Sequence, residues 1–99
     1  MIKDELPNQD YISQLMLLTE LEDMMNNDIV HFTYIKKDGT IRNAYGTRAM
    51  DIIETRCPEK PSKKEHFNAA TFPYFDLEKE DWRCFCIETL REINHNYTL

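Results

Sequence analysis

The fold is decided by residues 29–47, which read IVHFTYIKKDGTIRNAYGT. Two runs rich in β-branched and aromatic residues lie on either side of Asp38-Gly39. An Asp-Gly pair between two such runs is the strongest short-range signal for a β-hairpin, because glycine adopts the positive φ angles that a tight turn requires. This stretch therefore predicts two antiparallel strands joined by a short turn.

Two turn geometries fit this hairpin, and they differ by one residue in strand register. One is a two-residue type I′ turn, and the other is a type I turn at residues 37–39 completed by a glycine bulge. The second is preferred, because neither lysine of the turn then needs a positive φ angle. It predicts that Tyr34 lies opposite Arg42 and that Phe32 lies opposite Ala44.

A second hairpin is predicted in the C-terminal third of the chain. Residues 71–77 and 82–87 are rich in apolar and aromatic side chains, and the charged segment 78–81 separates them. Residues 8–27 predict an amphipathic helix, because apolar side chains recur there at three- and four-residue steps. Residues 47–56 fit either a short helix or a third strand, and this alternative stays open.

The remaining segments complete the predicted architecture. Residues 57–70 are expected to form a loop, because prolines and charges break both periodicities. The tail from Glu88 either extends the last strand or adds a helical turn. One helix followed by short strands predicts a mainly β fold: a small Sm/SH3-like antiparallel barrel of about five strands with an N-terminal helix. Residues 1–99 are expected to form a single domain, with the barrel spanning residues 29–93.

Length and composition restrict the class of protein. The chain has 99 residues, of which 41% are hydrophobic, and this suffices for one small core. No apolar run approaches the ~20 residues that a membrane span needs. The acidic residues that follow Met1 differ from the apolar segment of a secretory signal. Three cysteines are an odd number and do not make a disulfide framework. These features predict a cytoplasmic, soluble protein with no membrane partner.

The charge is unevenly distributed along the chain. The net charge is −6, and residues 1–28 alone hold seven acidic side chains and one lysine. A protein with this balance does not neutralise phosphates along a duplex, so non-specific duplex binding is disfavoured. The more basic middle of the chain leaves room for a local binding surface.

Arginine, lysine and aromatic side chains cluster in the two predicted hairpins and form the candidate ligand-binding set. Guanidinium groups hold phosphate or carboxylate groups in a bidentate manner, and aromatic rings stack on bases. The alternative interpretation is that the rings are core residues and that the arginines form ion pairs with neighbouring acidic residues. The candidate set is Tyr34, Lys36, Arg42, Tyr45, Arg48, Tyr74, Trp82 and Arg83.

No motif predicts catalysis, a cofactor or a metal. Cys84-x-Cys86 with Cys57, His66 or His95 resembles a zinc ligand set, but zinc pairs usually have a two-residue gap. Burial of these cysteines as small hydrophobic side chains is therefore preferred. His31 lies in a strand pattern and is interpreted as structural or surface-exposed. The chain also lacks the glycine-rich, nucleophile and metalloprotease motifs of common enzymes.

With both hairpins placed, two stretches resemble a known family. Residues 31–47, HFTYIKKDGTIRNAYGT, and residues 74–85, YFDLEKEDWRCF, are similar to the signature of a small bacterial family related to WYL domains, seen chiefly in Bacteroidetes and their phages. The resemblance covers residues 29–87. It implies an Sm-like SH3 barrel of a kind found in transcription regulators and defence systems, where it is thought to sense nucleic-acid or nucleotide ligands.

Two positions carry the family pattern and one departs from it. Arg42 and Arg83-Cys84-Phe85 look like arginine positions of the WYL family, whereas Phe75-Asp76-Leu77 stands where the Trp-Tyr-Leu tripeptide would be. The sequence thus predicts a non-enzymatic regulatory module that binds a nucleotide or single-stranded nucleic acid. The alternative is a protein-interaction adaptor, encoded by a phage or mobile element, whose acidic N-terminal helix or barrel edge binds a protein partner or a second copy.

Overall fold

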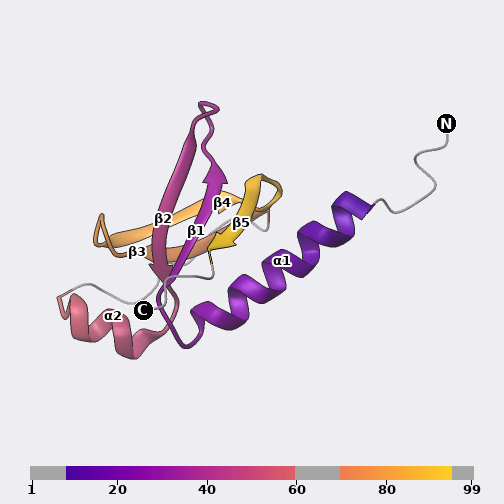
Figure 1. The fold of residues 1–99 in the computed structure, drawn as a ribbon. Helices are drawn as coiled ribbons and strands as arrows, with labels where there is room; N and C mark the ends of the chain where they lie inside the picture. The colour runs from indigo at the N-terminus through magenta and orange to yellow at the C-terminus, as the bar shows by residue number, and fades with distance from the viewer. Residues whose placement is uncertain (1–8, 60–69, 95–99) are drawn as a thin grey trace, which may run out of the picture.

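The computed structural model of the protein describes residues 9–59 and 70–94. An N-terminal helix precedes two antiparallel hairpins, a second helix lies between the hairpins, and a fifth strand follows them (Figure 1). In chain order the elements are α1 (Gln9–Met25), β1 (Val30–Ile35), β2 (Ile41–Thr47), α2 (Met50–Arg56), β3 (Thr71–Asp76), β4 (Asp81–Cys86), the 3-10 turn η2 (Ile87–Thr89) and β5 (Leu90–Asn94).

All five strands form one antiparallel sheet in the order β4-β3-β2-β1-β5. The prediction of a mainly β, Sm/SH3-like fold of about five strands with an N-terminal helix is confirmed. The expectation of a closed barrel is not met in the part of the chain that the structure describes, because β4 and β5 each have a single neighbour. Figure 1 shows β3 and β4 running across β1 and β2, so the sheet bends without closing. Helix α1 packs beside β5 and β1 and covers the core there.

The first hairpin has the register that the glycine-bulge turn predicts. Tyr34 lies opposite Arg42 and Phe32 opposite Ala44. Gly39 has a φ angle of 91° and donates its N–H to the carbonyl of Lys36 at 2.9 Å, which closes the type I turn. The turn is therefore determined by a glycine in the left-handed region that other residues adopt at a cost.

The main core lies on the inner face of the bent sheet. Aromatic rings dominate it: Phe32 meets Tyr74 edge to face at 5.0 Å, and Phe85 stacks against Tyr34 at 4.8 Å between ring centroids. These geometries suit the quadrupoles of the rings and add to the burial of apolar surface. Its buried members are Leu21, Met25, Val30, Phe32, Tyr34, Ala44, Phe72, Tyr74, Phe85, Leu90 and Ile93.

Of the two alternatives for residues 47–56, helix or strand, the structure shows the helix α2. Ala49, Ile53 and Cys57 are buried at four-residue spacing, whereas Asp51 and Thr55 between them are exposed. A strand would have turned all five side chains to one face, so only a helix buries this set. Ile53 and Cys57 pack with Phe75 in a second, smaller core on the outer face of β3.

The ends of the chain partly follow expectation. The helix predicted over residues 8–27 is observed as α1, and the tail from Glu88 combines both alternatives, since η2 precedes the strand β5. Most of the predicted 57–70 loop lies outside the described residues.

Among the described elements, neither helix has the length and apolar character to cross a membrane.

Candidate ligand-binding surface

The structure does not bring the eight candidate residues onto one face. Side chains alternate along each strand, and directly paired residues share a face. Tyr34, Arg42, Tyr74 and Arg83 belong to the inner face of the sheet, whereas Tyr45 and Trp82 belong to the outer face. Lys36 follows β1 at the exposed turn, and Arg48 follows β2. The expected single arginine–aromatic surface is thus divided between two sides of the sheet.

Two of the inner tyrosines are core residues. Tyr74 is fully buried and Tyr34 is 6% exposed, and their hydroxyl groups lie 3.0 Å apart. Burial, supported by the hydrogen bond with Tyr34, raises the pKa of Tyr74 far above the ordinary value of a tyrosine. Neither ring presents a face to solvent, so the alternative interpretation of core rings describes both.

Arg42 ends in a buried polar network. Its Nη2 donates to Oδ2 of the fully buried Asp76 at 2.5 Å and lies 3.5 Å from Oε1 of Glu78. Oδ1 of Asp76 accepts the backbone N–H groups of Glu78 and Lys79, which holds the β3–β4 turn. Desolvation opposes the charge of Arg42, but the hydrogen bond and the attraction of Asp76 outweigh it and raise the pKa of the guanidinium. Arg42 therefore stabilises the sheet from within.

Arg48 links α1 to β3 through a hydrogen bond and an ion pair. Its Nε donates to the carbonyl of Pro73 at 2.8 Å, and its Nη1 lies 3.4 Å from Oε2 of Glu22 on α1. The guanidinium carbon also lies 4.0 Å from the centre of the Phe72 ring, a cation–π contact. Burial lowers the pKa of Arg48. These contacts make Arg48 a structural side chain in this conformation.

The outer face of the first hairpin carries an exposed platform. The rings of His31 and Tyr45 stack in parallel, with 4.3 Å between centroids and 6° between planes, and Tyr45 is 40% exposed. Beside them, Oγ1 of Thr33 donates to Oδ1 of Asn43 at 2.9 Å. The cross-strand pairs of this hairpin platform are His31–Tyr45, Thr33–Asn43 and Ile35–Ile41.

Sequence reasoning missed His31 as part of this surface. The register that places Tyr34 opposite Arg42 also places His31 opposite Tyr45, and this pairing was the signal that could have found it. Lys36 is exposed where β1 leaves the platform for the turn. Figure 1 shows that the tip of this hairpin projects beyond β3 and β4. Of the platform side chains, those on β2 (Ile41, Asn43 and Tyr45) are exposed, whereas those on β1 (His31, Thr33 and Ile35) are half-buried.

The other predicted positions lie on β4. Trp82 meets Phe75 edge to face at 5.7 Å and packs against the second core, and its buried indole N–H has no acceptor among the described residues. Arg83 is exposed. The expected burial of the cysteine pair is wrong for Cys84, which lies opposite Pro73 on β4 and is exposed.

The remaining zinc candidates gain no support from this arrangement. Cys86 is half-buried and Cys57 is buried, and all three thiols of the chain are free. His66 and His95 lie outside the described residues. Within residues 9–59 and 70–94, no three metal-binding side chains come together.

The bent five-stranded antiparallel sheet and the N-terminal helix are those of a small Sm/SH3-like fold whose sheet stays open among the described residues. Residues 18–91 match the family model of WYL_2, which is described by this same fold. The chain belongs to the WYL_2 family, as its two hairpin stretches predicted. This is a family of regulatory and binding domains rather than of enzymes.

A phage protein is similar to most of the chain. It is the 11.5 kDa protein of the Gp31-cd intergenic region of Enterobacteria phage T4, which is 31% identical over 75 residues. The aligned region covers 75% of this chain and 74% of the phage protein. No solved structure matches the chain.

Proposed function

We propose that this WYL-like regulatory module binds a nucleotide or single-stranded nucleic acid on the hairpin platform. The observation that carries the proposal is the parallel stack of His31 and Tyr45 on an exposed sheet face. Every nucleobase has a flat π-face, so an exposed ring fixed by a neighbouring ring offers a stacking surface that tolerates different bases.

The side chains next to the stacked rings offer groups that could contact the base edges and the phosphates of such a ligand. Asn43 is exposed next to Tyr45 and brings amide donors within reach of base edges. The exposed Lys36 lies at the turn end of the platform, where its ammonium group is placed to bind a phosphate of the ligand. Of the predicted arginines, Arg83 is the exposed one, whereas Arg42 and Arg48 are engaged within the protein.

The electrostatics favours a weak, base-directed interaction. A net charge of −6 repels a polyanion, so phosphate attraction supplies little of the binding free energy. Stacking then dominates, and binding depends less on salt than it does for a basic groove. The exposed free thiol of Cys84 supports a reducing compartment such as the cytoplasm as the place of action.

The test is titration of the full chain with oligothymidylate and with adenosine nucleotides, followed by fluorescence anisotropy. Tyr45→Ala removes the exposed ring and is expected to weaken binding about tenfold or more, because one base stack contributes about 1–3 kcal/mol. Tyr45→Phe keeps the ring and is expected to keep the affinity. Tyr11→Ala is the matched control, since it removes an exposed tyrosine of α1 at 60% exposure.

Stability separates a binding role from a structural one. Tyr45→Ala is expected to change the free energy of unfolding by less than about 1 kcal/mol, because the ring is partly exposed. If neither probe binds the wild-type chain at millimolar concentration, the proposal is rejected. Equal loss of affinity in Tyr45→Ala and Tyr11→Ala also argues against the platform.

A second candidate function rests on a separate observation. Helix α1 packs one apolar face against β5 and β1 and leaves another exposed, with Tyr11, Ile12, Leu15 and Met16 between 41% and 66% exposed. Contiguous exposed apolar surface on a small protein marks an interaction site. This supports an adaptor role in which α1 captures a protein partner.

A further inference from the structure

The apolar side chains of α1 occupy two opposite faces of the helix. A surface helix normally keeps a single apolar stripe toward the core and charged residues on the other side. The inward stripe of α1 consists of Leu17, Leu18, Leu21 and Met25, which pack on the main core, and the half-buried Met24 at the edge of this stripe also packs there. Gln14 reinforces it, because its Nε2 donates to the carbonyls of Ile87 at 3.2 Å and Leu90 at 2.9 Å.

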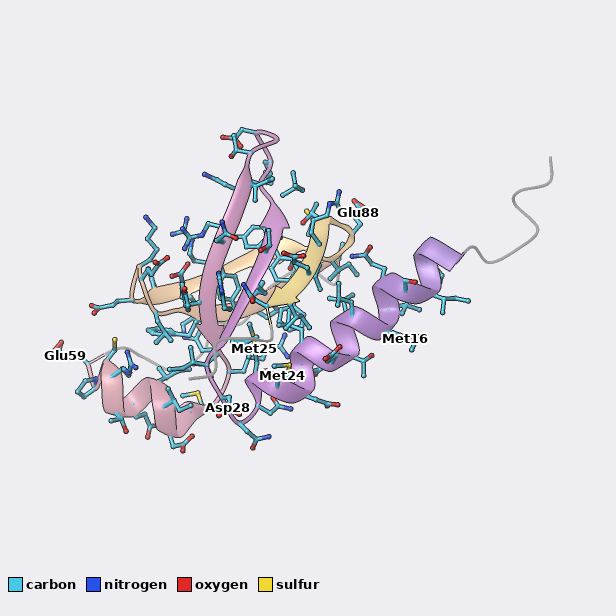
Figure 2. The ribbon with its side chains drawn as sticks, in the orientation of Figure 1. Met16, Met24, Met25, Asp28, Glu59 and Glu88 are labelled. Atoms are coloured by element: carbon cyan, nitrogen blue, oxygen red, sulfur yellow. The ribbon has the colours of Figure 1, made fainter. Side chains whose placement is uncertain are left out.

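The outward stripe lies about half a turn away from this packed face. Ile12 and Met16 are one helical turn apart, and Leu15 lies beside them. Met16 is 66% exposed, and Figure 2 shows it on the side of α1 that points away from the sheet. Since Gln14 fixes the rotation of the helix, the outward stripe does not turn inward to be covered by the sheet.

An open groove runs along this outward side. Its apolar lining residues come from the middle and the end of α1, and the carboxylates of Glu20 and Asp23 also line it. Two of the lining residues are methionines, whose flexible thioether side chains adapt to irregular apolar partners. The groove is lined by Leu15, Met16, Thr19, Glu20, Asp23 and Met24.

The two charged side chains that line this groove, Glu20 and Asp23, are both carboxylates. Residues 11–30 contain four acidic side chains, Glu20, Glu22, Asp23 and Asp28, and no lysine or arginine. A second copy of the chain would bring carboxylates against carboxylates, which disfavours self-association through this face. A partner with cations beside an apolar stripe complements it instead.

We infer that the outward groove of α1 docks a basic amphipathic helix of another protein. The partner's apolar stripe fills the surface between Ile12 and Met24, and its Lys or Arg side chains meet Glu20 and Asp23. This is recognition of one helix by an apolar groove, with the flanking charges selecting the partner. The inference rests on the second candidate function, the adaptor role, and names the chemistry of the partner.

The test uses the full chain and three labelled peptides of about 18 residues, a length at which helix formation is within reach. The first has leucine at helical spacing with lysine elsewhere, the second replaces every lysine by glutamate, and the third keeps the lysines but scrambles the leucine spacing. In fluorescence anisotropy, the first peptide is expected to bind at least about tenfold more tightly than either of the others.

Variants of the protein locate the site. Ile12→Gln with Met16→Gln is expected to weaken binding of the first peptide about tenfold, because the central apolar contacts of an interface carry most of its affinity. Glu20→Gln with Asp23→Asn is expected to weaken it about three- to tenfold, the range of exposed charge pairs. Glu54→Gln with Glu59→Gln removes the same charge from exposed positions in and after α2 and is expected to leave the affinity unchanged.

Each contrary result overturns a defined part of the account. Equal affinity for the lysine and glutamate peptides contradicts the basic partner and leaves the adaptor role standing. Failure of both helical peptides to bind, with α1 helical by circular dichroism, contradicts the adaptor role as well. A dimer in sedimentation velocity that Met16→Gln dissociates would make a second copy the occupant and overturn the inference. Tyr45→Ala on the hairpin platform is expected to leave the affinity for the first peptide unchanged, because the outward groove of α1 does not include Tyr45.

Discussion

The two faces of the first hairpin carry similar residue types in different environments. On the inner face, Tyr34 and Arg42 stand opposite each other and end in a buried network with Tyr74 and Asp76. On the outer face, Tyr45 stacks on a histidine and remains 40% exposed. Residue type therefore does not distinguish an exposed side chain from a buried one here. The position of each residue in the strand alternation, together with what covers that face, makes the distinction.

The largest effect is expected from breaking the inner network at Asp76. Asp76→Ala leaves Arg42, the hydroxyl of Tyr74 and two turn amides without their acceptor. Removing one partner of a buried ion pair costs about 3–5 kcal/mol, and the partial exposure of Arg42 favours the lower end. Urea denaturation measures this loss.

Asp81→Ala is the matched control for that experiment. Asp81 lies directly opposite Asp76 in the sheet but is exposed, so its removal is expected to cost less than about 1 kcal/mol. Equal destabilisation by the two substitutions would show that the inner network does not hold the fold.

A smaller loss is expected where the inner face allows no side chain. A Cβ at Gly46 would lie 2.4 Å from Cδ2 of Tyr74, so the ring has to move. Gly46→Ala is expected to lower the free energy of unfolding by about 1–3 kcal/mol, the usual cost of overpacking a core. Thermal and urea denaturation test this.

Gly39 provides the contrasting control. Nothing lies within 4 Å of a Cβ placed there, and its φ angle of 91° is the only constraint. Gly39→Asn is therefore expected to cost less than about 1 kcal/mol, because asparagine tolerates the left-handed region. If Gly39→Asn costs more than Gly46→Ala, close packing of Tyr74 is not what requires Gly46.

The smallest predicted effect is a loss of stability at alkaline pH. Burial raises the pKa of Tyr74 in the folded state, whereas the unfolded chain releases that proton near pH ~10. The stabilisation is therefore complete below pH ~10 and declines as the pH rises further, because only the unfolded state then loses the proton.

Thermal denaturation across this range measures the decline. Tm of the wild type is expected to fall more steeply above pH ~10 than Tm of Tyr74→Phe, which has no phenolic proton to lose. Parallel Tm curves for the two proteins would contradict a buried, protonated Tyr74.

Much of the fold could be predicted from local signals. Asp38-Gly39 determines the turn, and the turn determines the register of β1 and β2, so the pairing of Tyr34 with Arg42 followed from the sequence. The helix α1 followed from its apolar spacing. The sequence did not decide between helix and strand for residues 47–56, because their apolar positions match both periodicities. The burial of Ile53 and Cys57 against Phe75, a long-range contact, selects the helix.

The candidate site was less accessible to sequence reasoning. The placement of Tyr74 and Asp76 relative to β2 depends on the long-range pairs Gly46–Asp76 and Thr47–Phe75, which no local pattern specifies. Exposure of Cys84 depends on which face of β4 the core covers, and the core covers the face of Phe85. The apolar spacing of α1 fits core packing and partner binding alike, and only the packed structure separates the inward stripe from the outward one.

The most direct test of this account is an NMR titration of the ¹⁵N-labelled chain with oligothymidylate. If the hairpin platform is the ligand site, the largest amide shifts are expected at His31, Thr33, Asn43 and Tyr45, and the inner residues Tyr34 and Tyr74 change little. Largest shifts on α1 or around Arg83 on β4 would contradict the platform as the ligand site.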